Sequence, residues 1–89
     1  MIEINLTIIN KLGLHARAAA KLAATANQFS CEIKAGRDDK KVNAKSVMSL
    51  MLLAASQGTE LSFIFDGVDE QDACNAVKTL VSDYFGEQE

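Results

Sequence analysis

The sequence has 89 residues, 48% of them hydrophobic and 24% charged, which suits one domain over residues 1–89. The net charge of −3 argues against nucleic acid as the main partner, and no apolar run reaches the roughly 20 residues of a membrane span. Cys31 and Cys74 are too few for a disulfide framework or a zinc site, and no secretory signal is visible, so we expect a cytoplasmic protein.

The charges are unevenly distributed along the chain. Residues 1–45 carry eight basic and four acidic side chains, whereas residues 46–89 carry one basic and eight acidic side chains. One interpretation is a solvated surface with chance asymmetry. The other is a basic docking face that meets an acidic partner or an anionic group.

The first half of the sequence predicts a strand, a helix and a hairpin. Apolar residues alternate with polar ones over residues 2–8, as in a half-buried strand. Residues 16–27 are rich in alanine and favour a helix with a stripe of small side chains. That stripe is expected to contain Ala16, Ala19, Ala20, Ala23 and Ala26. Strands at 31–35 and 42–44 flank a polar turn at 36–40.

The second half predicts a helix, a strand and a last helix. Ser46 is expected to be the N-cap of a helix over 47–54, with Gly58 as its stop signal. A fourth strand over 60–65 ends at Asp66 and Gly67, and Asp69 is expected to cap the last helix. Its inward residues are expected to be Ala73, Val77, Leu80, Val81 and Tyr84. The order β-α-β-β-α-β-α predicts a two-layer α+β sandwich, with the helices on one face of a mainly antiparallel sheet.

His15 is the one histidine of the chain, and it stands directly before the first predicted helix. Spacing alone leaves two interpretations, a capping or solvated side chain and a functional one. At a helix start, the free amides of Ala16 and Arg17 and the helix dipole favour a bound phosphoryl group. The Arg17 guanidinium adds a charge-assisted contact, and Gly13 permits a close backbone approach.

The run Asn10-Lys11-Leu12-Gly13-Leu14-His15-Ala16-Arg17 resembles the active-site motif of the HPr family, the histidine-containing phosphocarriers of the bacterial phosphotransferase system. Residues 44–50, 57–59 and 69–71 also resemble segments of that family. The resemblance implies an open-faced β-sandwich of strand order 1-4-2-3 with three helices on one face. It also implies that Enzyme I phosphorylates Nδ1 of His15, which then passes the group to an EIIA-type protein. Such a protein is a stoichiometric carrier, not an enzyme, and needs no cofactor or metal.

The chain departs from the family pattern at Ala18, where the family usually has proline after the arginine. Proline in a first helical turn sacrifices no hydrogen bond, and alanine leaves the unfolded chain freer. The substitution affects the rigidity of the site, not its chemistry.

The predicted second helix is apolar almost all round, so some of Met48, Met51 and Leu52 should remain exposed as a partner surface. The resemblance places this patch beside His15. The residues assigned to docking are Ala20, Lys21, Val47, Met48, Met51 and Leu52. Ser46 matches a position that some family members use for regulatory phosphorylation by a kinase.

Three functions stay open at this point. Two are phosphocarriers, one serving sugar uptake and one signalling in a nitrogen-branch phosphotransferase system. The third is an α+β domain that binds a ligand or acts as a scaffold, which the presence of His15 disfavours. An independent enzyme is disfavoured because no second acid–base group or metal cluster accompanies His15.

Overall fold

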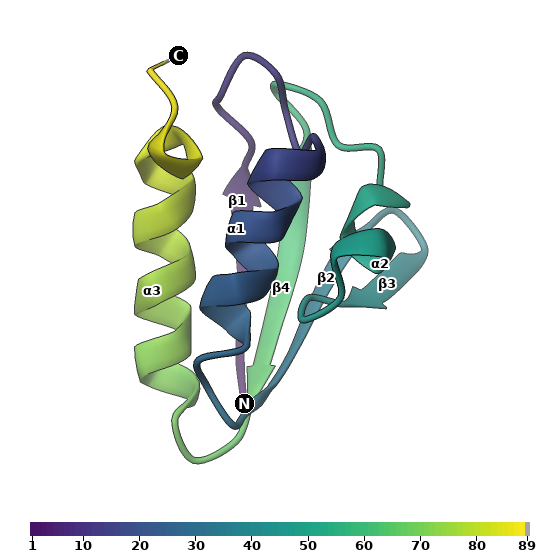
Figure 1. Cartoon of the computed structure of the whole chain (residues 1–89). Helices are drawn as coiled ribbons and strands as arrows, with labels where there is room; N and C mark the ends of the chain where they lie inside the picture. Colours follow the sequence, from purple (N-terminus) through teal and green to yellow (C-terminus); the bar gives the residue numbers. More distant parts are fainter. Residues whose placement is uncertain (89) are drawn as a thin grey trace.

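The computed structural model describes residues 1–88 as one sheet covered by helices (Figure 1). The elements in chain order are β1 (Ile2–Thr7), α1 (Ala16–Ala26), β2 (Glu32–Arg37), β3 (Lys40–Asn43), α2 (Val47–Met51), β4 (Glu60–Asp66), α3 (Glu70–Ser82) and a 3₁₀ turn, η1 (Tyr84–Gly86). This order confirms the β-α-β-β-α-β-α prediction.

The four strands form an antiparallel sheet in the order β1-β4-β2-β3, which confirms the order implied by the family resemblance. In the register of the sheet, Phe63 of β4 lies between Ile4 of β1 and Ala35 of β2. All three helices lie on the same side of the sheet (Figure 1). The end of β1, the start of α1 and the C-terminal end of α3 meet at one end of the molecule.

The core lies between the sheet and the helices. The inward residues of β4 are Leu61, Phe63 and Phe65, and none of their surface is exposed. Helix α1 buries mostly alanine and one leucine against them, and such short side chains let its backbone lie close to the strands. Its buried residues are Ala18, Ala19, Leu22, Ala23 and Ala26. The predicted stripe was therefore wrong at Ala16 and Ala20, which are exposed.

Helix α2 is shorter than predicted, because it ends at Met51 instead of residue 54. After Met51 the amides of Leu53 and Ala54 bond three residues back, and Ala54 then takes a left-handed conformation with φ of 49°. The Arg37 guanidinium binds the two carbonyls exposed by this turn, Leu53 O at 3.0 Å and Ala54 O at 2.8 Å. A side chain from β2 thus provides hydrogen bonds to the carbonyls that follow α2.

Two predictions for the last helix were wrong. Asp69 stands at the N-cap position of α3 but makes no capping bond, since its carboxylate accepts from the amides of Ser30 and Cys31 instead. Tyr84 lies outside α3 and is 38% exposed, and the neighbouring Phe85 is the buried aromatic residue.

The hairpin turn is tighter than the predicted 36–40, because Gly36, Arg37 and Lys40 pair within β2 and β3. None of the helices within residues 1–88 has the length and apolar character needed to cross a membrane.

Candidate functional site

The loop between β1 and α1 carries His15 and is fixed by backbone bonds to residues 55–58. Gly58 N donates to Ile8 O at 2.7 Å, and Leu14 N donates to Ala55 O at 2.8 Å. Gly13 has φ of +69°, and a Cβ there would lie 2.6 Å from Ala55 O, so this position requires glycine. The loop therefore holds His15 in a defined place at the start of α1.

His15 is the N-cap residue of α1, with extended backbone angles. Its side chain makes no capping hydrogen bond, so a side-chain capping role does not explain the position of His15. Its carbonyl accepts the first helical bond, from Ala19 N at 2.8 Å. The amides of Ala16 and Arg17 precede that bond, so helix geometry leaves them available to an anion.

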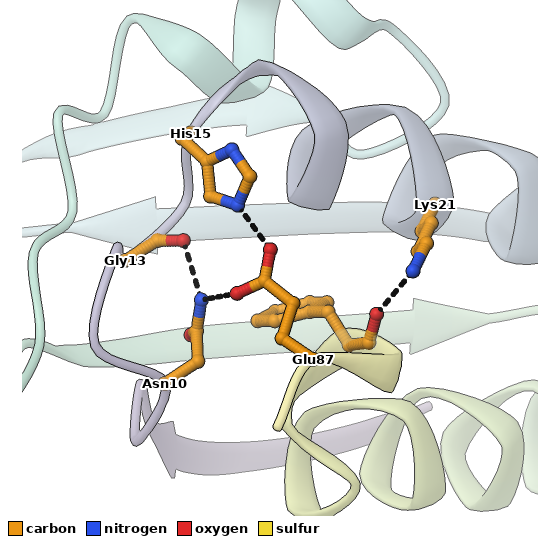
Figure 2. A network of polar contacts seen from close by, with 6 residues as sticks. Asn10, Gly13, His15, Lys21 and Glu87 are labelled. Atoms are coloured by element: carbon orange, nitrogen blue, oxygen red, sulfur yellow. Dashed lines mark hydrogen bonds and ion pairs between the residues drawn. The ribbon is translucent and has the colours of Figure 1, made fainter. Parts of the chain in front are cut away.

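The ring of His15 is held from one side by Glu87 (Figure 2). Nε2 of His15 contacts Oε2 of Glu87, while Nδ1 lies on the side of the ring away from that carboxylate. The side chains are 27% and 13% exposed, respectively, so the contact is partly shielded from water while the ring stays accessible.

Asn10 ties Glu87 to the loop before His15. Its Nδ2 donates to Gly13 O and to Glu87 Oε1, both at 2.8 Å. Both partners are acceptors, which sets the orientation of the amide. Asn10 is fully buried, and among residues 1–88 its Oδ1 has no hydrogen-bond partner. The bond from Asn10, joined by that from His15, holds the pKa of the Glu87 carboxyl below its ordinary value, although partial burial opposes this shift.

Sequence reasoning missed Glu87 altogether, and Asn10 was noted only as part of the motif. Glu87 stands 72 residues from His15, so no local spacing connects them. A polar asparagine directly after an apolar strand was the one available signal for Asn10.

A hollow of about 490 Å³ opens beside this network. Its lining includes Lys11, Arg17 and Lys21, with Glu87 and Gln88 from the C-terminal segment. Arg17 is exposed, and within the described residues its guanidinium makes no hydrogen bond or ion pair. Lys21 is engaged, because its Nζ donates to Phe85 O at 2.7 Å. The hollow thus presents positive charge beside the His15–Glu87 pair.

The residues assigned to docking divide into exposed and partly buried ones. Met48, Met51 and Leu52 are 80%, 45% and 66% exposed, as the sequence predicted. Ala20 is also exposed, whereas Val47 and Lys21 are partly buried. Ser46 is the N-cap of α2, and its Oγ accepts from Ser49 N at 3.3 Å, which confirms the structural role predicted for it.

Comparisons with known proteins agree over the whole chain. Residues 2–83 match the family model described as "PTS HPr component phosphorylation site". The phosphocarrier protein HPr of Neisseria meningitidis serogroup A is 48% identical over 89 residues, and that of Cupriavidus necator is 47% identical, each covering 100% of both chains. Among solved structures, HPr-C-His from Thermoanaerobacter tengcongensis has 45% identity and a TM-score of 0.96, again covering 100% of both chains.

The four-stranded sheet, its helical cover and the full-length relatives define a small phosphocarrier protein. The chain belongs to the HPr family of the phosphotransferase system. The role of this family is phosphoryl transfer from Enzyme I to EIIA-type proteins, in which each member is a stoichiometric carrier and not a catalyst.

Proposed function

We propose that His15 carries the phosphoryl group in this chain, and that the acceptor atom is Nδ1. The observation that carries this proposal is the orientation of the ring, whose Nε2 contacts Glu87 while Nδ1 lies away from it (Figure 2). A neutral imidazole with its proton on Nε2 has its lone pair on Nδ1, which is the nucleophilic form.

The surroundings of His15 suit a dianionic group. The start of α1 provides the amides of Ala16 and Arg17, which have no carbonyl partner within the helix, together with the positive end of the helix dipole. The Arg17 side chain is exposed and lines the hollow, so its guanidinium supplies a cation that can bind phosphoryl oxygens. These groups stabilise the phosphorylated state without providing a catalytic acid or base, which leaves catalysis to the partner proteins.

The partner surface is proposed to include the exposed apolar side chains of α2 and also Ala20, Lys21 and Val47. Helix α2 packs against α1, so Met48, Met51 and Leu52 belong to the helical layer that also carries His15. Methionine side chains adapt to different partners, and a relay protein must bind both Enzyme I and an EIIA-type acceptor. We further propose that a kinase can modify Ser46, which adds negative charge at the edge of this surface.

We also propose that the chain acts in the cytoplasm as one domain over residues 1–89. Cys31 and Cys74 are both free and buried, which fits a reducing compartment.

The test is phosphorylation of the purified protein by Enzyme I and phosphoenolpyruvate, followed by transfer to an EIIA-type protein. We expect one phosphoryl group per chain, labile in acid and stable in base, as a phosphoramidate is. His15→Ala should fold, by its circular dichroism and melting curve, and take up no label. Labelling of folded His15→Ala, or no labelling of the parent, would contradict the proposal.

A further inference from the structure

The chain leaves α3 in a left-handed turn. Tyr84, Phe85 and Gly86 have φ values of 58°, 54° and 79°, and only the last is glycine. Left-handed backbone at two bulky residues costs about 1–3 kcal/mol each and persists only where the surroundings impose it. The fully buried Phe85 ring anchors the turn, and Lys21 Nζ holds its carbonyl at 2.7 Å. The packing of Phe85 and the bond from Lys21 therefore offset the cost of the left-handed backbone that places residue 87.

The turn places the Glu87 carboxylate at the site, where each of its two oxygens contacts a side chain. Oε2 of Glu87 contacts Nε2 of His15, and Oε1 accepts from Asn10 Nδ2 at 2.8 Å. Asn10 is itself fixed by its second bond, to Gly13 O at 2.8 Å, in the loop that carries His15 (Figure 2). The pKa of Glu87 is lowered, first by the Asn10 bond, so the carboxylate remains ionised at neutral pH. An ionised carboxylate only accepts hydrogen bonds, so the proton in this contact lies on Nε2.

We propose that Glu87 is a positioning residue for phosphoryl transfer, which keeps the proton of His15 on Nε2 and so directs the Nδ1 lone pair at phosphorus. This inference rests on the proposed function of His15. As Nδ1 forms its bond to phosphorus, the donor's bond to phosphorus breaks and its electron pair returns to the donor group. The proton stays on Nε2 throughout, and Glu87 stabilises the positive charge that develops on the ring. In the onward transfer the same steps run in reverse.

The matched variants are Glu87→Gln and Glu3→Gln. Glu87→Gln keeps the shape of the side chain and removes its charge, and Glu3→Gln makes the same change in net charge at an exposed position of β1. With Enzyme I and phosphoenolpyruvate, we expect Glu87→Gln to lower kcat for phosphorylation about tenfold or more at unchanged KM, because the ring loses the carboxylate that fixes its tautomer. Glu3→Gln should behave as the parent does.

A second measurement separates this inference from the proposed function. The ¹⁵N chemical shifts of the neutral His15 ring report the tautomer directly and need no Enzyme I. The parent and Glu3→Gln should show the proton on Nε2, and Glu87→Gln should show an increased population with the proton on Nδ1. Unchanged ring shifts in Glu87→Gln, or an unchanged kcat, would overturn the role of Glu87 and leave phosphorylation of His15 intact. A parent that Enzyme I does not phosphorylate would overturn the function, and the ring shifts would still decide the role of Glu87.

Discussion

Asp69 shows how a single side chain joins two segments that are far apart in the sequence. Its Oδ2 accepts from Ser30 N at 2.8 Å, and its Oδ1 accepts from Cys31 N at 2.9 Å. These bonds fasten the entry to β2 against the start of α3. The bond from Ser30, reinforced by that from Cys31, holds the pKa of Asp69 below its ordinary value, although partial burial opposes the shift.

This lowered pKa predicts how stability depends on pH. A carboxyl whose pKa is lower in the folded state than in the unfolded chain adds stability above the unfolded pKa of about 3.9. That stability is lost as the pH falls through the lower, folded pKa. Asp69→Asn should therefore unfold at lower urea concentration at pH 7 and show a flatter stability profile below about pH 4. Asp72→Asn, an exposed change in the same helical turn, is the control. If the stabilities of Asp69→Asn and the parent change in parallel with pH, Asp69 does not contribute to the pH dependence.

Ala18, where the chain departs from the family pattern, lies in the first turn of α1. The first helical bond runs from Ala19 N to His15 O, so the N–H of Ala18 lies outside the helical ladder and proline there breaks no helical bond. Arg17 is already helical, and proline at 18 restricts it, which offsets part of the gain.

We therefore expect Ala18→Pro to stabilise the protein by about 0.5 kcal/mol, chiefly by restricting the unfolded chain. This corresponds to a rise in melting temperature of about 2–4 °C for a domain of this size. The rate of His15 phosphorylation should be equal to or above that of the parent, because the amides of Ala16 and Arg17 are better fixed. Ala18 is fully buried, so a large fall in melting temperature would mean that the core has no room for the ring.

At the scale of elements, α2 combines a structural cap with an exposed apolar surface. Ser46 binds Ser49 N through its side chain, and Leu50 is buried beneath the helix. Met48 and Leu52 face solvent. A charge at residue 46 therefore changes the surface that partners contact while the cap can persist.

Ser46→Asp should thus separate folding from docking. Aspartate at an N-cap still accepts a hydrogen bond from the backbone, so the melting temperature should change little. We expect its negative charge to weaken binding to Enzyme I, because a basic docking face suits an acidic partner, and the effect should shrink with added salt. Gln71→Glu adds the same charge in the first turn of α3 and should bind as the parent does. Equal affinities for Ser46→Asp and the parent, measured by calorimetry, would show that α2 is not the docking surface.

The elements also show how far the sequence alone could predict this molecule. Alternation and helical periodicity were enough for the strands and helices, because each of these signals is local. The predicted end of α2 was three residues too late, because Arg37 of β2 binds the carbonyls of the turn in which the helix ends. Asp69 was wrong as a cap because the amides of Ser30 and Cys31 compete for its carboxylate.

The candidate site divides in the same way. His15, Ala16 and Arg17 are consecutive, so their placement at one helix start follows from the local sequence. The contact with Glu87 depends on the packing of Phe85 and on the left-handed turn before it, which no local pattern encodes.

At the scale of the whole molecule, the open-faced sandwich brings segments from the first and the second half of the sequence together at one end of the structure. The loop after β1, the start of α1 and the segment after α3 meet there (Figure 1). Lys11, Arg17 and Lys21 come from the basic first half of the sequence, and Glu87 comes from the acidic second half. The uneven distribution of charge along the sequence thus places basic side chains around the hollow and the Glu87 carboxylate against His15.

The central claim is that Nδ1 of His15 accepts the phosphoryl group at the start of α1. Its most direct test is ¹H–¹⁵N NMR of the protein before and after phosphorylation by Enzyme I. We expect phosphorus attached to Nδ1, a proton retained on Nε2, and the largest backbone amide shifts at Ala16 and Arg17. A phosphoryl group on Nε2 or on another residue, or amide shifts centred away from the start of α1, would contradict the account.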